Sequence, residues 1–162
     1  MTVETTAETA RKGGTTDDRR LVLVLGVGRS GTSLITGILG QVGFHVPQPE
    51  IRADETNPRG FGEPEWVVKF HTRLMEQLRV TVFDARPRAW EITGRVTGEP
   101  AIRAELRDWL GTQLAVSDAV IVKDPRIGWF LPLWMSCAGE LGVPTLHGLH
   151  ERLAAITDDQ GL

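Results

Sequence analysis

Hydrophobic residues fall into two short continuous runs and several periodic stretches, separated by segments rich in proline and glycine. The runs cover 21–25 and 119–122 and consist of Leu, Val, Ile and Ala. Such a run is typical of a strand buried on both faces, as in a parallel sheet. The sequence therefore predicts two interior strands that lie far apart in the chain.

Amphipathic helices are predicted where apolar residues recur every three or four positions. These helices cover 32–42, 64–78 and 99–115, and a further helix is predicted within 128–141. In the first, Leu34, Ile35, Ile38 and Leu39 form one apolar stripe. Residues 80–83 are predicted to form a short strand, and 84–98 a loop.

The order strand, helix, helix, strand, helix predicts an α/β fold with a mainly parallel sheet. The chain has 162 residues, which suits one domain. We predict a disordered leader over 1–20, a domain over 21–143 and an atypical tail over 144–162, since the leader shows no apolar periodicity.

Composition excludes several functional classes. The net charge of −3 argues against a broadly basic nucleic-acid binder. A single cysteine, Cys137, excludes an internal disulfide and argues against structural zinc. We also expect no membrane span and no signal peptide, because no apolar run is long enough and the first residues are polar. These features predict a cytoplasmic protein.

A glycine-rich segment between the first strand and the first helix carries the clearest chemistry. It reads Gly-Val-Gly-Arg-Ser-Gly-Thr-Ser over 26–33. In such a loop, backbone N–H groups and a helix N-terminus converge on one point, and glycines let an anion approach the backbone. The segment therefore predicts an anion cradle whose cation is Arg29.

Two general nucleotide motifs fit this segment only in part. Gly26, Gly28 and Gly31 match the dinucleotide fingerprint G-x-G-x-x-G, but the acid required about twenty residues later is missing, because prolines interrupt the next candidate strand. A Walker-A loop also fits, with Thr32 in place of the phosphate-binding lysine. Binding of NAD and a degenerate P-loop kinase or NTPase thus remain as alternatives.

Three segments together resemble bacterial PAPS-dependent sulfotransferases. They are Arg-Ser-Gly-Thr-Ser over 29–33, Asn-Pro-Arg-Gly-Phe-Gly-Glu over 57–63, and Val-Lys-Asp-Pro-Arg over 122–126, the last followed by Pro132 and Trp134. The resemblance spans 21–143. It implies a P-loop-like three-layer α/β/α fold, PAPS as the co-substrate, no metal, and a small-molecule or glycan hydroxyl as the acceptor.

The resemblance also implies roles for individual residues. Gly28, Arg29, Ser30, Gly31, Thr32 and Ser33 would hold the 5′-phosphosulfate. Arg29 and Lys123 would stabilise charge on the leaving phosphate and on the transferred sulfuryl group. The general base is expected to be a carboxylate, with Glu63 fitting best and Glu50 and Glu55 as rivals. Alternatively, Glu63 serves only the start of the next helix through the helix dipole.

The last part of the chain departs from this family. The later strand and the Arg and Ser that hold the 3′-phosphate are not recognisable after Val143. We therefore expect a fold that is incomplete at its C-terminus, and a non-catalytic nucleotide-binding remnant is a further alternative. Asp124 and Arg126 are predicted to form a salt bridge that shapes their loop. Trp66, Trp129 and Trp134 are predicted to belong to the core or to a pocket wall.

Overall fold

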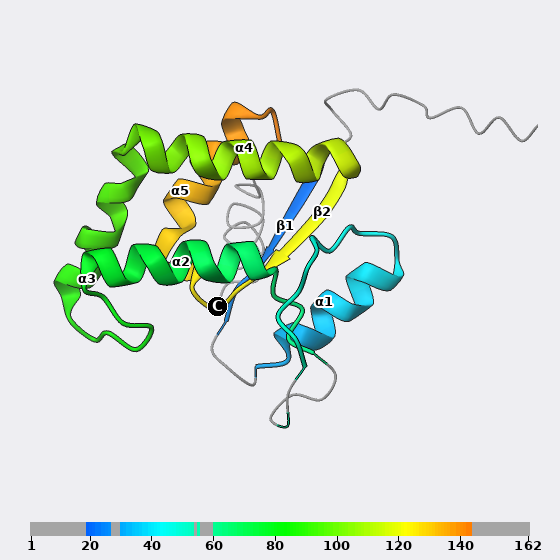
Figure 1. Ribbon diagram of the computed structural model, residues 1–162, viewed down its shortest axis with the longest axis horizontal. Coiled ribbons are helices and arrows are strands. Elements are labelled where there is room, and N and C mark those ends of the chain that lie inside the picture. The colour runs from blue at the N-terminus through cyan, green and yellow to red at the C-terminus, as the bar shows by residue number, and fades with distance from the viewer. Residues whose placement is uncertain (1–18, 27–29, 54, 56–59, 144–162) are drawn as a thin grey trace, which may run out of the picture.

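The computed structural model describes residues 19–26, 30–53, 55 and 60–143 of this chain. These residues form a mixed α/β fold (Figure 1). Its elements are β1 (Arg20–Val24), α1 (Thr32–Gln41), α2 (Glu65–Leu78), α3 (Pro87–Gly94), the 3₁₀ helix η2 (Arg95–Gly98), α4 (Pro100–Val116), β2 (Ala119–Lys123) and α5 (Ile127–Glu140). The predicted leader and tail fall outside the described residues, apart from Arg19 and Arg20.

The two predicted strands pair directly and in parallel, as expected. Arg20 lies opposite Ala119 and Val24 lies opposite Lys123. On the other edge of β2, His45 forms a short parallel bridge to Val120. The parallel register brings the segment after β1 and the segment after β2 to the same edge of the sheet, where ligands of open α/β sheets bind.

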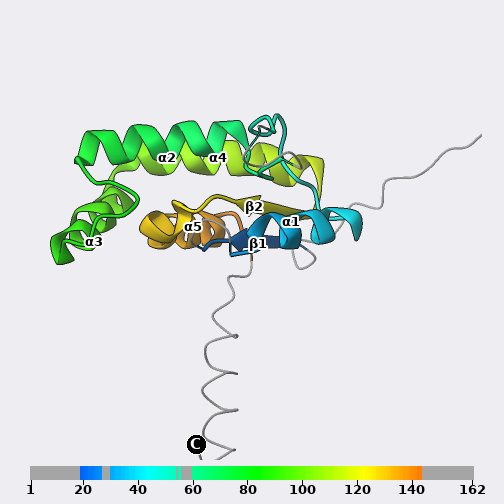
Figure 2. The same ribbon diagram turned by 90° about the horizontal axis from the view of Figure 1, so that it is seen from below.

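The hydrophobic core lies between one face of this sheet and the long helices. Figure 2 shows α2 and α4 side by side in one layer, with the strands, α5 and α1 beneath them. The fully buried side chains of this core come from α2, α4, β2 and α5 and include Leu74, Leu106, Leu110, Val120, Val122, Phe130 and Trp134. Because Val120 and Val122 are buried in this core, these positions of β2 face the helices.

Side chains of β2 alternate between two surroundings. Val120 and Val122 join the core, whereas Ile121 is buried outside that cluster. Alternation along a strand therefore directs Ile121 and Lys123 toward the other face, where α1 contacts β2. The lysine at the end of β2 thus faces the helix that follows the glycine-rich segment.

The apolar stripe predicted for α1 does not face the described core. Leu34 is 64% exposed, and Ile35 and Ile38 are also exposed. Thr36 is the residue of α1 that is buried. Thr36, a small polar residue, is therefore the buried contact of α1, whereas Leu34, Ile35 and Ile38 stay exposed and Leu39 is half-buried.

Two local predictions were wrong. Residues 80–83 form a turn after α2 rather than a strand, and 84–98 contain α3 and η2 rather than a continuous loop. The β-branched residues of 80–83 have no partner strand among the described residues, so their propensity alone does not make a strand. Pro87 begins α3 at its first position, where the missing N–H of proline costs nothing. No helix in the described ranges has both the length and the apolar character needed to cross a bilayer.

Candidate functional site

Three segments that the sequence singled out meet at one backbone oxygen. The carbonyl of Phe61 accepts a hydrogen bond from Ser33 Oγ at 3.1 Å and another from Lys123 Nζ at 3.1 Å. Ser33 belongs to the first turn of α1, and Lys123 ends β2. Residues 33, 61 and 123 are far apart in the chain, yet they meet at the carboxyl edge of the sheet.

The central polar contact of this site is an ion pair between Lys123 and Glu63. Lys123 Nζ lies 2.5 Å from Glu63 Oε1. The residues are only 4% and 8% exposed, respectively. Burying two charges is costly unless they are paired and further hydrogen-bonded, and the ammonium meets both conditions through Glu63 and the Phe61 carbonyl. The pair therefore fixes the Lys123 ammonium group at the edge of the sheet where the glycine-rich segment begins.

The loop that carries Glu63 is fixed by its backbone on two sides. Glu63 O accepts from Ile51 N at 2.8 Å, and Glu65 N donates to Pro49 O at 2.8 Å. Gly62 adopts a φ of 66° and sits against Thr36 of α1, where a Cβ would come within 3.1 Å of Thr36 Cγ2. Only glycine meets both requirements without strain. The sequence Gly62-Glu63 thus sets the position of the carboxylate.

The three candidate carboxylates differ in their surroundings. Only Glu63 contacts Lys123 among the described residues. Glu50 accepts a hydrogen bond from Gln48 Nε2 at 2.6 Å in an exposed position, and Glu55 is exposed. Glu63 also immediately precedes Pro64 and α2, so a helix-start position and contact with Lys123 coexist in the same residue.

The structure describes only part of the predicted anion cradle. Gly28 and Arg29 lie outside the described residues, whereas Ser30, Gly31, Thr32 and Ser33 are described. Gly31 has a φ of 83° and precedes the first residue of α1. N–H groups at the start of a helix lack partners four residues back, and here that of Leu34 instead donates to Gly31 O at 3.0 Å. A helix start of this kind can bind an anion, and the cradle stays a prediction.

A buried histidine, not identified as a site residue from the sequence, braces the residue after Lys123. His71 of α2 and Asp124 are both fully buried, and His71 Nδ1 lies 3.4 Å from Asp124 Oδ2. Trp134 Nε1 donates to His71 Nε2 at 2.9 Å. Because an indole N–H can only donate, Nε2 accepts and the neutral ring carries its proton on Nδ1, facing Asp124.

The signal that could have found His71 is its position on α2. It lies four residues after Val67, on the same stripe as Phe70 and Leu74. A polar residue on such a stripe is buried by its apolar neighbours and must find partners there. Burial lowers the pKa of the His71 imidazole below its usual value, although Asp124 acts to raise it.

Asp124 also forms the predicted salt bridge with Arg126. Its carboxylate accepts hydrogen bonds from the backbone N of Arg126 at 2.7 Å and from Arg126 Nη1 at 2.9 Å. Burial of the carboxyl group acts to raise its pKa, but the adjacent His71 ring and the Arg126 guanidinium outweigh burial and hold this pKa below its usual value. The loop after β2 is therefore held around an ionised carboxylate.

The predicted positions of the tryptophans are confirmed. Trp134 is fully buried in the core, Trp66 packs against that core, and Trp129 is a buried residue that lines a pocket.

In the part of the chain that the structure describes, no three His, Cys, Asp or Glu side chains gather closely enough to hold a metal ion.

Comparisons with protein-family models, with curated proteins and with solved structures found no match for this chain.

Proposed function

We propose that this protein is a sulfotransferase that moves a sulfuryl group from PAPS to a hydroxyl group. The observation that carries the proposal is the meeting of Ser33, Phe61 and Lys123 at one carbonyl oxygen. Each residue comes from a different one of the three segments on which the family resemblance rests.

The proposed architecture is a P-loop-like three-layer α/β/α domain. It is supported by two parallel strands, by a glycine-rich segment between β1 and α1, and by Lys123 at the carboxyl end of the neighbouring strand. In this arrangement α1 lies on one face of the sheet, and α2 and α4 lie over the other. The cradle and Lys123 are then on the same edge.

Sulfuryl transfer requires positioning and positive charge more than covalent help from the protein. The oxygen of the acceptor hydroxyl forms a new bond to sulfur, while the bond between sulfur and the 5′-phosphate oxygen breaks. The leaving phosphate keeps the electron pair, stabilised by Arg29 and the N-terminus of α1. Lys123 holds the oxygens of the transferred group.

The proton of the acceptor hydroxyl goes to Glu63 in this scheme. The carboxylate lies 2.5 Å from Lys123 Nζ, so base and cation share one small region. Glu63 contacts Lys123 through Oε1, and an ionised carboxylate has about four acceptor positions, so it can also accept the incoming hydroxyl. A base must come within hydrogen-bond reach of the proton it removes, and this arrangement allows it.

A calorimetric titration with PAP, the desulfated donor, tests this proposal. We expect PAP to bind, and ATP with Mg²⁺ or NADH to bind far more weakly. Arg29→Ala should weaken PAP binding about ten- to a hundredfold, because a lost charge-assisted contact costs about 1.5–3 kcal/mol.

Arg20→Ala is the matched control, since this exposed arginine begins β1 at the opposite end of the strand from the cradle. It should leave the affinity for PAP unchanged. Preference for Mg²⁺-ATP would instead support the degenerate kinase or NTPase, and failure of a folded sample to bind any of these nucleotides would reject the proposal.

A further inference from the structure

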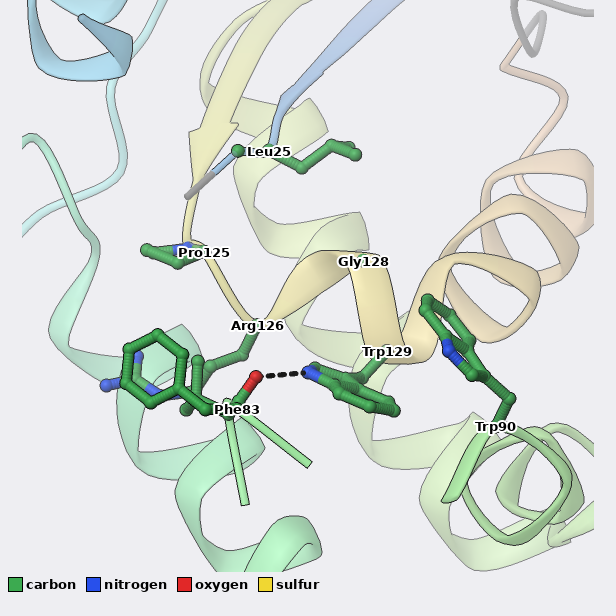
Figure 3. A pocket seen from close by; sticks show the side chains of 9 residues that line it. Leu25, Phe83, Trp90, Pro125, Arg126, Gly128 and Trp129 are labelled. Atoms are coloured by element: carbon green, nitrogen blue, oxygen red, sulfur yellow. Dashed lines mark hydrogen bonds between the residues drawn. The ribbon is translucent and has the colours of Figure 1, made fainter. Parts of the chain in front are cut away.

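A pocket of about 510 Å³ opens beside α3 and the first turn of α5. Its walls include Leu25, Phe83, Trp90, Pro125, Arg126 and Trp129 (Figure 3). Neither Lys123 nor Glu63 lines it, since the alternation at the end of β2 directs Lys123 toward α1. Its size falls within the range of about 300–1,000 Å³ that is typical of small-molecule sites. The pocket is therefore a second space that the proposed transfer does not use.

Two tryptophans form a rigid wall of this pocket. The rings of Trp90 on α3 and Trp129 on α5 are stacked, with centroids 4.6 Å apart and planes inclined by 26°. Trp129 Nε1 donates to Val82 O at 3.3 Å, which fixes the orientation of its indole (Figure 3). The outer ring, that of Trp90, is thus backed by a side chain that is itself held in place.

The pocket leaves aromatic surface open to a ligand. Phe83 is 89% exposed and Trp90 is 57% exposed. Large apolar side chains gathered around a concavity mark a binding site, because covering them removes apolar surface from water. Aromatic rings add a stacking preference, so these two side chains favour a flat aromatic ligand over a saturated one of the same size.

Arg126 is the charged side chain among the residues that line the pocket, and its hydrogen bonds are only partly used. Its Nη1 donates to the two carboxylate oxygens of Asp124 at 3.1 and 2.9 Å. Its Nε and Nη2 have no hydrogen-bond partner among the described residues, and the side chain is 23% exposed. Asp124 is fully buried and does not line the pocket. A ligand there meets the guanidinium and not the carboxylate.

The two remaining donor groups of Arg126 determine which polar group a ligand must carry. A guanidinium donates hydrogen bonds and accepts none, so the group opposite it has to be an acceptor. Nε and Nη2 lie on one edge of the planar guanidinium, and such an edge holds a carboxylate through two parallel hydrogen bonds. A carboxylate therefore fits this edge better than a single neutral acceptor does.

We propose that this pocket binds a flat aromatic carboxylate, with its ring against Phe83 and Trp90 and its carboxylate on Nε and Nη2 of Arg126. The side chain of Arg126 runs from the start of α5 toward the ring of Phe83, so the ring contact and the donor edge lie close together (Figure 3). Such a ligand has no hydroxyl group to receive a sulfuryl group. The pocket is thus a separate binding site, and the inference does not rest on the proposed function.

Isothermal titration calorimetry of the full-length protein with 2-naphthoate tests the inference. Decahydro-2-naphthoate keeps the carboxylate and lacks the aromatic ring, whereas methyl 2-naphthoate keeps the ring and lacks the charge. We expect 2-naphthoate to bind about three- to tenfold more tightly than the saturated acid, through ring stacking. It should bind at least about tenfold more tightly than the ester, because a charge-assisted pair of hydrogen bonds is lost.

Variants of the pocket test the same two contacts from the side of the protein. Phe83→Ala and Trp90→Ala should each weaken 2-naphthoate binding about three- to tenfold. Arg126→Lys keeps the positive charge but not the two-pronged edge, and should weaken binding about tenfold while the preference for the aromatic acid remains. Phe83 and Trp90 are exposed, so circular dichroism should show an unchanged fold in their variants.

Val116→Ala is the control, because this exposed residue ends α4 just before the start of β2, at the opposite end of that strand from the pocket. It should leave binding unaltered. Equal affinity for 2-naphthoate and either analogue, affinity unchanged in both aromatic variants, or no binding up to the solubility limit of 2-naphthoate overturns the inference.

A titration with 2-naphthoate in saturating PAP separates this site from the proposed transfer centre. We expect the affinity for 2-naphthoate to be unchanged, and its displacement by PAP would overturn the inference. Binding that depends on Phe83 and Trp90, in a protein that does not bind PAP, keeps this site and rejects the proposed function. Binding of PAP without binding of 2-naphthoate keeps the proposed function and rejects this site.

Discussion

The carboxylate of Asp124 is held by two residues from different parts of the chain. His71 reaches it from α2, and Arg126 reaches it from the same loop through both its backbone N–H and its guanidinium. Trp134 of α5 fixes the tautomer of His71 from behind. Because Asp124 follows Lys123 directly, this small network determines where the backbone leaves β2 and hence where the ammonium is anchored.

Replacement of His71 should therefore be felt in stability. His71→Leu leaves the indole N–H of Trp134 without its acceptor and removes the imidazole beside Asp124. A buried polar group left unsatisfied costs about 1–3 kcal/mol. We expect urea unfolding to show a loss of at least this size for His71→Leu.

His71→Asn gives the comparison, because its amide can still donate toward Asp124. We expect a smaller loss of unfolding free energy than in His71→Leu. Equal losses in the two variants would show that the imidazole acts by filling volume and not by supplying a polar partner.

The elements of the site were predicted better than their contacts. Both strands, α1, α2 and α4 were predicted to within one residue at each end, and α5 was predicted only as a helix within 128–141, because continuous apolar runs and regular spacing reflect burial directly. The resemblance assigned Glu63 and Lys123 to one site, whereas their ion pair was not predicted. The stripe of α1 was misleading, since periodicity shows that one face is apolar but not whether anything among the described residues covers it.

Neither α3 nor the role of His71 followed from the pattern. The first is a short helix with few apolar positions, and its main signal is Pro87 at the start. The second depends on which side chains of α5 and of the loop after β2 come to lie against α2. Contacts between distant segments are set by the whole fold, so a single local stretch does not reveal them.

The loop over 60–63 is an element whose shape rests on its glycines. Gly60 and Gly62 both have positive φ, at 83° and 66°. Only Gly62 is pressed against α1, because a Cβ at Gly60 would meet nothing within 4 Å. The two positions therefore share the same backbone demand but differ in packing.

Gly60→Ala and Gly62→Ala form a matched pair that separates these effects. Each should lose about 1–2 kcal/mol of unfolding free energy for placing a Cβ in a left-handed conformation. Gly62→Ala should lose more, because Thr36 must move, and it should weaken PAP binding by displacing Glu63 and the Phe61 carbonyl. Chemical denaturation and the PAP titration measure the two consequences; identical behaviour of both variants would contradict the packing described for Gly62.

The stability of the whole molecule is linked to proton uptake at His71. The unfolded chain binds a proton at this imidazole near the usual pKa of about 6.5, whereas the folded protein keeps the ring neutral to lower pH. Between the pKa of His71 in the folded protein and its pKa in the unfolded chain, the unfolded state binds more protons. The free energy of unfolding must therefore fall as the pH is lowered through this window.

We expect thermal and urea unfolding to show this loss as the pH falls below about 6.5, with a slope of at most about 1.4 kcal/mol per pH unit. His71→Asn should flatten the slope, because the amide does not titrate. His45→Gln is the control and should retain it, since His45 lies on the other edge of β2 and contacts Gln113. A slope that persists unchanged in His71→Asn would assign the proton uptake to another group.

Because side chains alternate at the end of β2, consecutive residues there lie in different surroundings on the two sides of the sheet. Lys123 belongs to the surroundings of α1 and Glu63, while Asp124 belongs to those of α2 and α5. A mutation close to Trp129 can leave the groups around Lys123 unchanged, as long as the peptide between residues 123 and 124 stays in place. The two sides of the sheet can therefore be altered independently, one at the ion pair of Lys123 and the other at the contact of His71 with Asp124.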